Sequence, residues 1–217
     1  TQGVSSAASD VYKRQVPALS SAVVDHLAAG WQGIRSIDIC IAPAQGAPRG
    51  EATLAGVLAY CGAPIRVWQH GRWTEQPGWA RPSVVRFARM RPRHGALCDI
   101  PDLELFPARH PGVQSVMFRA ALEVGLTQQA FAFLAALRRI GLLPAPQKLA
   151  RLLHATGGLF DAFGSALGGM VVRVEGIDAR GAAAQRAWHI AADDNHGPEI
   201  PCCLLYTSDA ADDTPCV

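Results

Sequence analysis

The sharpest polar cluster in the sequence is the run Cys98-Asp99-Ile100-Pro101-Asp102. Two carboxylates on a loop that proline stiffens could bind a substrate ammonium group or hold a proton, and a cysteine thiol is a nucleophile when a base activates it. We therefore name Asp99 and Cys98 as candidate catalytic residues and Asp102 as a candidate substrate-binding residue. The structural alternatives stay open, since Asp102 could cap a short helix that follows it and Cys98 could be an inert buried thiol.

A second candidate site is the pair Arg49-Gly50 at the start of a predicted helix. Backbone N–H groups in the first turn of a helix, together with an arginine, can hold a carboxylate or a phosphate. We name Arg49 and Gly50 as candidate substrate-binding residues. The alternative is an ordinary loop arginine beside a glycine that gives the backbone freedom.

The seven histidines are scattered along the chain, and none has the spacing of metal ligands. We therefore expect no metal site. His196 precedes Gly197-Pro198 in a predicted loop and could face a cleft, so it is a further candidate substrate-binding residue. The alternative is that His196 is an ordinary loop histidine.

Helices and hairpin-connected strands are mixed along the chain. Apolar periodicity and Gly or Pro stops predict helices over residues 16–30, 49–60, 102–106, 128–140 and 146–155. Alternation predicts strands over 34–42, 65–68, 72–74, 84–90, 113–122, 170–177 and 186–192. The stretch 91–111 is predicted to be a long loop around one short helix. This mixture predicts an α+β fold, in which helices pack on a mixed, largely antiparallel sheet.

The two predicted helices 128–140 and 146–155 are rich in Phe and Leu. Such helices could lie on a membrane surface. The commoner arrangement is that they pack on each other and on the sheet, and we therefore expect no membrane association.

Composition narrows the class of protein. The chain of 217 residues has a formal net charge of +2, which with dispersed basic residues is too weak to indicate a nucleic-acid partner. The cysteines form no C-x-x-C pair and are typical of buried thiols in a reduced compartment. We expect a cytoplasmic protein that acts on a small molecule.

The two ends of the chain are related through the genetic code. Residues 5–15 and 203–213 can be encoded by one oligonucleotide read in its two orientations, a relation that natural tails would not explain. We therefore expect 1–15 and 203–217 to derive from a sequencing adapter, and such segments are excluded from fold reasoning. On this interpretation the natural protein is an internal fragment of about 16–202.

Several stretches, taken in order, resemble the saccharopine dehydrogenase-like oxidoreductases. They are VPALS at 16–20, RGEAT at 49–53, WQHGRW at 68–73, CDIPDLELFP at 98–107, FGS at 163–165 with GGM at 168–170, and HGPEIP at 196–201. The resemblance implies an N-terminal Rossmann domain that binds NAD(P), followed by an α+β domain that helps to close the active site. This sequence is similar to the second part.

In domain terms, the resemblance makes 16–30 the last helix of the Rossmann domain and 16–202 the substrate and dimerisation domain. The glycine-rich turn that binds the cofactor phosphates has no counterpart in this sequence. NADP or NAD is therefore implied by the resemblance alone, with Val16 and Pro17 as the candidate cofactor-binding residues.

The resemblance implies that the parent protein transfers a hydride between NAD(P)H and an imine, amine or carbonyl substrate. It also implies a homodimer, and a fragment that is inactive by itself. The alternative is a non-catalytic α+β module for assembly or ligand binding. A glycine-rich turn in the upstream reading frame would separate the two hypotheses.

Overall fold

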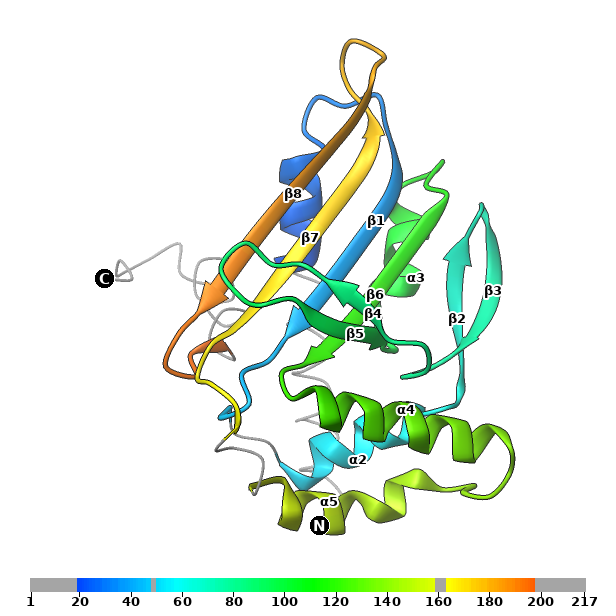
Figure 1. Cartoon of the computed structure of the whole chain (residues 1–217). Coiled ribbons are helices and arrows are strands. Elements are labelled where there is room, and N and C mark those ends of the chain that lie inside the picture. Colours follow the sequence, from blue (N-terminus) through cyan, green and yellow to red (C-terminus); the bar gives the residue numbers. More distant parts are fainter. Residues whose placement is uncertain (1–18, 48–49, 159–162, 198–217) are drawn as a thin grey trace, which may run out of the picture.

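The computed structural model describes residues 19–47, 50–158 and 163–197, and over this part the chain forms one eight-stranded sheet with helices against it (Figure 1). β1 runs parallel to β6, and the other paired strands run antiparallel. The order is β3-β2-β6-β1-β7-β8, with β5 added to β6 and β4 added to β5. The predicted α+β fold is confirmed. The strands are β1 (Gly33–Ala42), β2 (Pro64–Gln69), β3 (Arg72–Pro77), β4 (Ser83–Val85), β5 (Arg93–Leu97), β6 (Ser115–Leu122), β7 (Gly168–Ile177) and β8 (Ala183–Ala192).

Helical residues fall where the sequence predicts helices. Residues 19–27 are helical, and the predicted start of this helix lies outside the described residues. The remaining helices are α2 (Glu51–Tyr60), α3 (Asp102–Arg109), α4 (Gly125–Arg139), the short 3-10 helix η1 (Pro146–Leu149) and α5 (Ala150–Gly157). Helix α4 begins at Gly125 rather than at Gln128 because Gln128 is a buried part of the helix, and its Oε1 accepts the Leu122 N–H at 3.1 Å.

The predicted loop 91–111 contains strand β5, so the prediction of a loop was wrong for Arg93–Leu97. Its proline, charge and glycine resemble a loop, but Gly95 pairs with Ala121 of β6 and with Ser83 of β4. A Cβ at Gly95 would lie 3.0 Å from Val85 Cγ2 and 3.2 Å from Cys40 Sγ, so a glycine lets β5 pass close to its neighbours. The predicted strand 84–90 is correspondingly short, since only Ser83–Val85 pairs with β5.

The β7–β8 hairpin confirms the clearest antiparallel pair in the sequence. Its register runs from Gly168 opposite Ala192 to Ile177 opposite Ala183. At the turn, Asp178 Oδ1 accepts the backbone N–H groups of Arg180 at 2.8 Å and Ala182 at 2.9 Å. An aspartate that ties down its own turn in this way explains why the two long strands meet in a single register.

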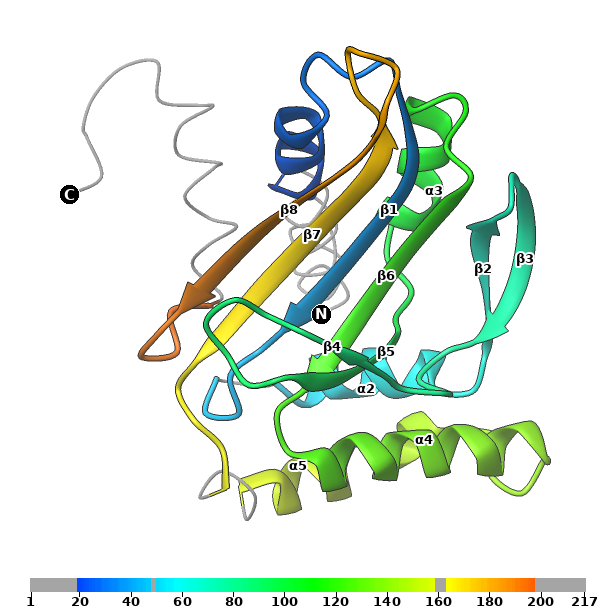
Figure 2. The ribbon, with the colours of Figure 1, turned by 45° about the horizontal axis from the view of Figure 1, so that its top comes forward.

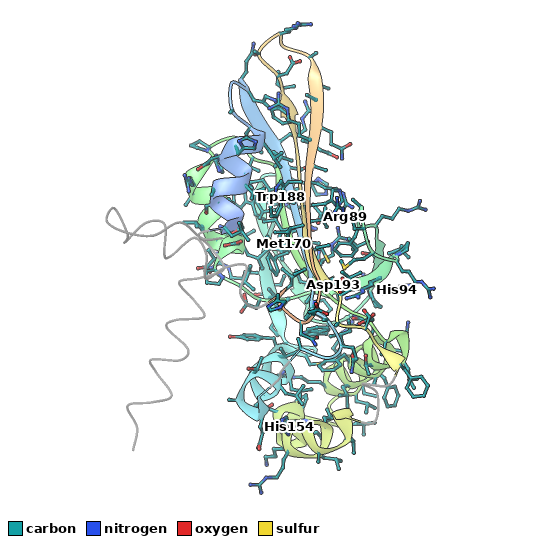
Figure 3. The ribbon with its side chains drawn as sticks, turned by 90° about the vertical axis from the view of Figure 1, so that its left-hand side faces the viewer. Arg89, His94, His154, Met170, Trp188 and Asp193 are labelled. Carbon is teal, nitrogen blue, oxygen red and sulfur yellow. The ribbon has the colours of Figure 1, made fainter. Side chains whose placement is uncertain are left out.

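The two faces of the sheet are covered by different kinds of side chain. One face carries the main apolar core, which the helical residues 19–27 and α3 cover with side chains such as Val24 and Phe106. Figure 3 shows the sheet nearly edge-on, with Met170 and Trp188 toward these helices and Arg89 and His94 on the other side. Phe106 is fully buried, so its truncation to alanine should cost about 3–5 kcal/mol.

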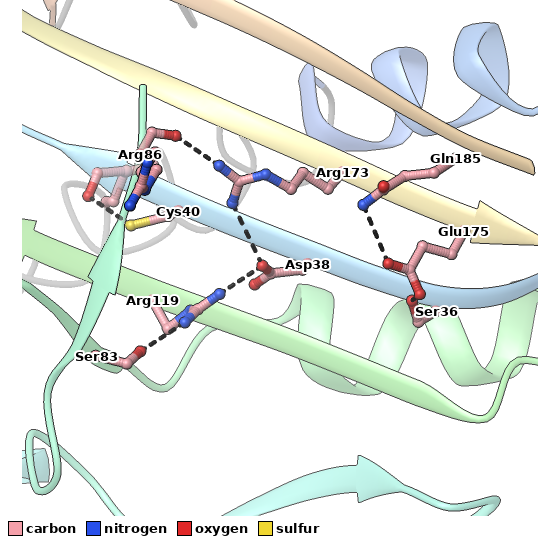
Figure 4. Close-up of polar contacts among 10 residues, drawn as sticks. Ser36, Asp38, Cys40, Ser83, Arg86, Arg119, Arg173, Glu175 and Gln185 are labelled. Carbon is pink, nitrogen blue, oxygen red and sulfur yellow. Dashed lines mark hydrogen bonds and ion pairs between the residues drawn. The ribbon is translucent and has the colours of Figure 1, made fainter. Parts of the chain in front are cut away.

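The second face carries a layer of charge across its central strands (Figure 4). Asp38 of β1 forms ion pairs with Arg119 of β6 and with Arg173 of β7, the latter at 3.6 Å. Arg119 also donates to Ser83 Oγ at 2.7 Å, and Arg173 donates to the Arg86 carbonyl. These contacts fasten the β4 segment over the sheet, so the two arginines have a structural role.

The remaining helices gather at one end of the sheet (Figures 1 and 2). Helix α4 packs there through Phe131, whose ring centroid lies 4.9 Å from that of Trp79, and through the buried Ala135. Arg138 Nη1 donates to the carbonyls of Ala59 at 2.6 Å and Cys61 at 3.1 Å. The inner face of α4 therefore packs on the body of the protein, as the sequence predicts.

Candidate functional site

A buried arginine lies at the edge of the sheet where β1 and β6 end and β7 begins. Arg93, the first residue of β5, is 6% exposed. Its guanidinium donates to the carbonyls of Pro43 at 3.0 Å and Leu167 at 2.9 Å, and its Nη2 lies 3.2 Å from Glu123 Oε1. Burial lowers the pKa of Arg93, and the Glu123 carboxylate opposes this shift. The arginine thus joins two loops to the end of β6.

Glu123 completes this cluster immediately after β6. Its Oε1 accepts the Ser165 hydroxyl at 2.6 Å, and its Oε2 accepts the Gln45 N–H at 3.0 Å. Burial raises the pKa of Glu123, but the hydrogen bonds from Ser165 and Gln45 and the charge of Arg93 outweigh burial and leave this pKa below its usual value. We call Arg93, Glu123, Gln45 and Ser165 the edge cluster.

The loop that carries Ser165 has a close contact that only glycine permits. A Cβ at Gly164 would lie 2.0 Å from the Cβ of Gln45, far inside van der Waals contact. The adjoining Ala166 carbonyl accepts the Asn195 N–H at 2.9 Å. The loops after β1, before β7 and after β8 are therefore held together around the edge cluster.

Two of the predicted substrate-binding residues belong to the loops near this edge. Gly50 is the N-cap of α2, where its carbonyl accepts the Leu54 N–H at 3.1 Å and no side chain caps the helix. His196 is exposed, and its backbone N–H donates to the Asp193 carbonyl at 2.9 Å. Arg49 lies outside the described residues, as do the cofactor candidates Val16 and Pro17.

The other predicted site residues lie on the helix-covered face of the sheet. Asp102 is the first residue of α3, is fully buried, and interacts with Ser20 of the helical residues 19–27. Burial raises the pKa of Asp102 to about 6, and the interaction with Ser20 acts in the opposite direction. The N-cap of α3 is Pro101, without a side-chain cap, so the interpretation of Asp102 as an N-cap is wrong.

Cys98 and Asp99 precede α3 on the same loop. Burial, and then the Asp99 carboxylate, raise the pKa of the Cys98 thiol to about 12. This thiol is protonated at neutral pH and is a weak nucleophile. Asp99 lies at the surface, and its pKa is raised first by loss of solvent and then by the Glu104 carboxylate. Of the three residues, Asp99 is the most exposed, Cys98 is partly buried and Asp102 is buried.

The described residues that the sequence predicts for the site thus fall into two groups. Gly50 and His196 lie on loops near the edge cluster, whereas Cys98, Asp99 and Asp102 lie on the helix-covered face of the sheet. Arg93 and Glu123 are not among the predicted site residues, because in the sequence each resembles a surface charge beside the end of a strand. A usable signal was present in Glu123, a lone acid directly after an apolar strand, which is a position where side chains commonly serve a site.

Two hollows of the described part of the chain are small. One cavity of about 50 Å³ is lined by Phe87, Met90, His189 and Ile190, and an open hollow of about 230 Å³ is lined by Arg35, Glu175 and Gln185. Both are smaller than the roughly 300–1,000 Å³ of sites for drug-sized ligands. Within residues 19–47, 50–158 and 163–197, no group of three His, Cys, Asp or Glu side chains is arranged to hold a metal ion.

Comparison with known proteins gives a likeness of fold. No family model matches the chain, and no curated protein matches it in sequence. Among solved structures, the chain is similar to apo histidine-tagged saccharopine dehydrogenase (L-Glu forming) from Saccharomyces cerevisiae, with a TM-score of 0.57 and 10% sequence identity. The likeness covers 89% of this chain and 63% of that one. This chain therefore shares the fold of part of a saccharopine dehydrogenase.

Proposed function

We propose that this chain is the substrate-side α+β part of a saccharopine dehydrogenase-like oxidoreductase. The parent protein transfers a hydride between NAD(P)H and an imine, amine or carbonyl substrate, and the chain is inactive by itself. The observation that carries the proposal is the likeness of fold over 89% of the chain, in agreement with the ordered sequence stretches that resemble the same family.

The described residues lack the usual phosphate-binding turn for a dinucleotide. They contain no G-x-G-x-x-G sequence between a strand and a helix. The nicotinamide, which supplies the hydride when bound, therefore belongs to a separate dinucleotide-binding domain of the parent. This chain contributes side chains that bind and orient the substrate.

Within that proposal, the accessible Asp99 carboxylate holds the substrate ammonium group or a proton. The full burial of Asp102 favours a positioning role, in which Asp102 joins the substrate loop to the helical residues 19–27 through Ser20. The edge cluster fixes the loops that carry Gly50 and His196, and these loops form a second wall of the substrate site. Cys98 has a structural role, in which its apolar packing stabilises the loop before α3.

The parent protein is proposed to be a cytoplasmic homodimer that acts on a small molecule. The decisive observation is the reading frame upstream of this chain in its genome of origin. A G-x-G-x-x-G turn after a first strand, with an acid or an arginine about twenty residues later, supports the oxidoreductase. An upstream frame without such a turn would replace this proposal with the non-catalytic α+β module.

A further inference from the structure

Five of the six most exposed large apolar side chains of the described residues gather in one part of the chain, and the sixth is Phe163, which is 76% exposed. Leu142 is 72% exposed, Ile140 68%, Leu126 66%, Phe133 63% and Leu152 60%, and all five belong to α4, α5 or the turn between them. Soluble proteins seldom concentrate exposed apolar side chains in this way without a binding role. We call residues 125–157 the α4–α5 segment.

Helix α4 is apolar on two opposite faces. Its inner face, with Phe131 and Ala135, packs on Trp79 and the sheet. Its outer face carries Leu126, Phe133 and Ile140, which are spaced seven residues apart and so align along one side of the helix. A surface helix needs only one apolar face, so the outer stripe requires a partner that the described chain does not supply.

The charge of the α4–α5 segment identifies the class of partner. The segment contains four basic residues, Arg138, Arg139, Lys148 and Arg151, together with His154, and it contains no Asp or Glu. Arg138 is engaged by backbone carbonyls, whereas Arg139 and Lys148 are exposed, and Arg151 lies 4.0 Å from Glu51. Figure 3 shows His154 at the extreme of this helical end. The exposed Arg139 and Lys148 flank the apolar side chains of the segment, and such a surface is complementary to an apolar surface flanked by anions.

We propose that the α4–α5 segment binds the surface of a bilayer that contains anionic phospholipid. Exposed Leu and Phe side chains would enter the boundary between headgroups and acyl chains, while Arg139 and Lys148 would contact lipid phosphates. The proposal replaces our expectation of no membrane association, which assumed that the apolar residues of both helices pack inward. The proposed contact is peripheral. None of the described helices is long and apolar enough to cross a bilayer.

A second copy of the chain fits this surface less well. Pairing two outer stripes would bring the same uncompensated basic residues together, and like charges across an interface oppose association. An anionic membrane removes this repulsion and takes up the apolar stripe at the same time.

Vesicle flotation of the whole chain tests the proposal. Vesicles of phosphatidylcholine mixed with phosphatidylglycerol should carry the protein upward, and vesicles of phosphatidylcholine alone should carry much less. Replacing exposed charges in R139Q and K148Q should weaken binding about fivefold for each charge, and added salt should weaken it further. The triple variant L126Q/F133Q/L142Q should weaken binding at least about tenfold.

A matched control uses exposed apolar residues elsewhere. Val84, 57% exposed in β4, and Leu105, 38% exposed in α3, lie outside the segment, so V84Q/L105Q should float like the original chain. Near-equal melting temperatures would show that all variants are folded. Absence of flotation with the mixed vesicles would overturn the proposal, as would equal flotation of the triple variant. Light scattering that shows a dimer, broken by the triple variant without any vesicle binding, would instead assign the surface to a second copy.

Discussion

Arg93 Nη2 lies 3.2 Å from Glu123 Oε1, and this pair joins the loop after β1 and the loop before β7 to the end of β6. The first residue of a strand and the first residue after another strand thus act as one clamp. Its partners are mostly backbone groups, so the clamp fixes the position of loops rather than the identity of their side chains.

Removing members of this clamp should destabilise the chain in a definite order. R93A leaves Glu123 without its cation and two carbonyls without a donor, and should cost about 3–5 kcal/mol in the free energy of unfolding. E123Q keeps the shape and should cost about 1–3 kcal/mol, and S165A about 1 kcal/mol. Urea denaturation measures all three. An R93A variant as stable as S165A would show that the pair is not a clamp.

Burial of Asp102 should make stability depend on pH. Its pKa is about 6 in the folded chain against an ordinary 3.8, so the folded state holds a proton that the unfolded state has released. Stability from this group is full below about pH 4 and is lost as pH rises through about 6, up to about 3 kcal/mol. D102N cannot ionise, so it should be more stable than the original chain at pH 8, and this advantage should shrink at pH 4. Denaturation at the two pH values measures it, and an advantage that does not change with pH would contradict the burial of an ionisable carboxyl.

Gly164 should tolerate no side chain while Gln45 keeps its Cβ. G164A places a methyl group 2.0 Å from that atom and should cost about 1–3 kcal/mol through overpacking. The cost should persist in a Q45A background, which retains the Cβ, and largely vanish in a Q45G background. G56A is the matched control, since a Cβ at Gly56 of α2 meets nothing within 4 Å and should stabilise the helix by about 0.5–1 kcal/mol. Equal effects of G164A in all three backgrounds would rule out this contact as the cause.

The three thiols of the described chain should react slowly. Burial raises the pKa of Cys40 and Cys98 to about 12 and of Cys61 to about 11. The thiolate is the reactive form, so alkylation by iodoacetamide at pH 7.5 should modify these residues far more slowly in the folded chain than in urea. Peptide mass spectrometry distinguishes them from Cys202, Cys203 and Cys216. Rapid folded-state labelling of Cys98 would restore it as a candidate nucleophile.

Sequence reasoning succeeded where a local pattern decides the structure. The β7–β8 hairpin follows from alternation and from the Asp178 turn, and α2 lies where a helix is predicted between Arg49 and the stop at Gly62. It failed where distant segments decide, because β5 forms by pairing with β4 and β6 and needs the room that Gly95 leaves for Cys40. The site residues also differ in whether the sequence alone points to them. The carboxylates near α3 stand out in the sequence, whereas Arg93 and Glu123 are recognisable only once four loops meet.

The most direct measurement of the central claim is cofactor binding by the intact parent protein, expressed from the complete reading frame. Saturating NADPH or NADH should raise its stability, by about 2.7 kcal/mol at a hundredfold excess over the dissociation constant. The present chain by itself should show no such shift, because its described residues contain no dinucleotide turn. A parent protein whose thermal unfolding is unchanged by either nucleotide would contradict the assignment to an NAD(P)-dependent oxidoreductase.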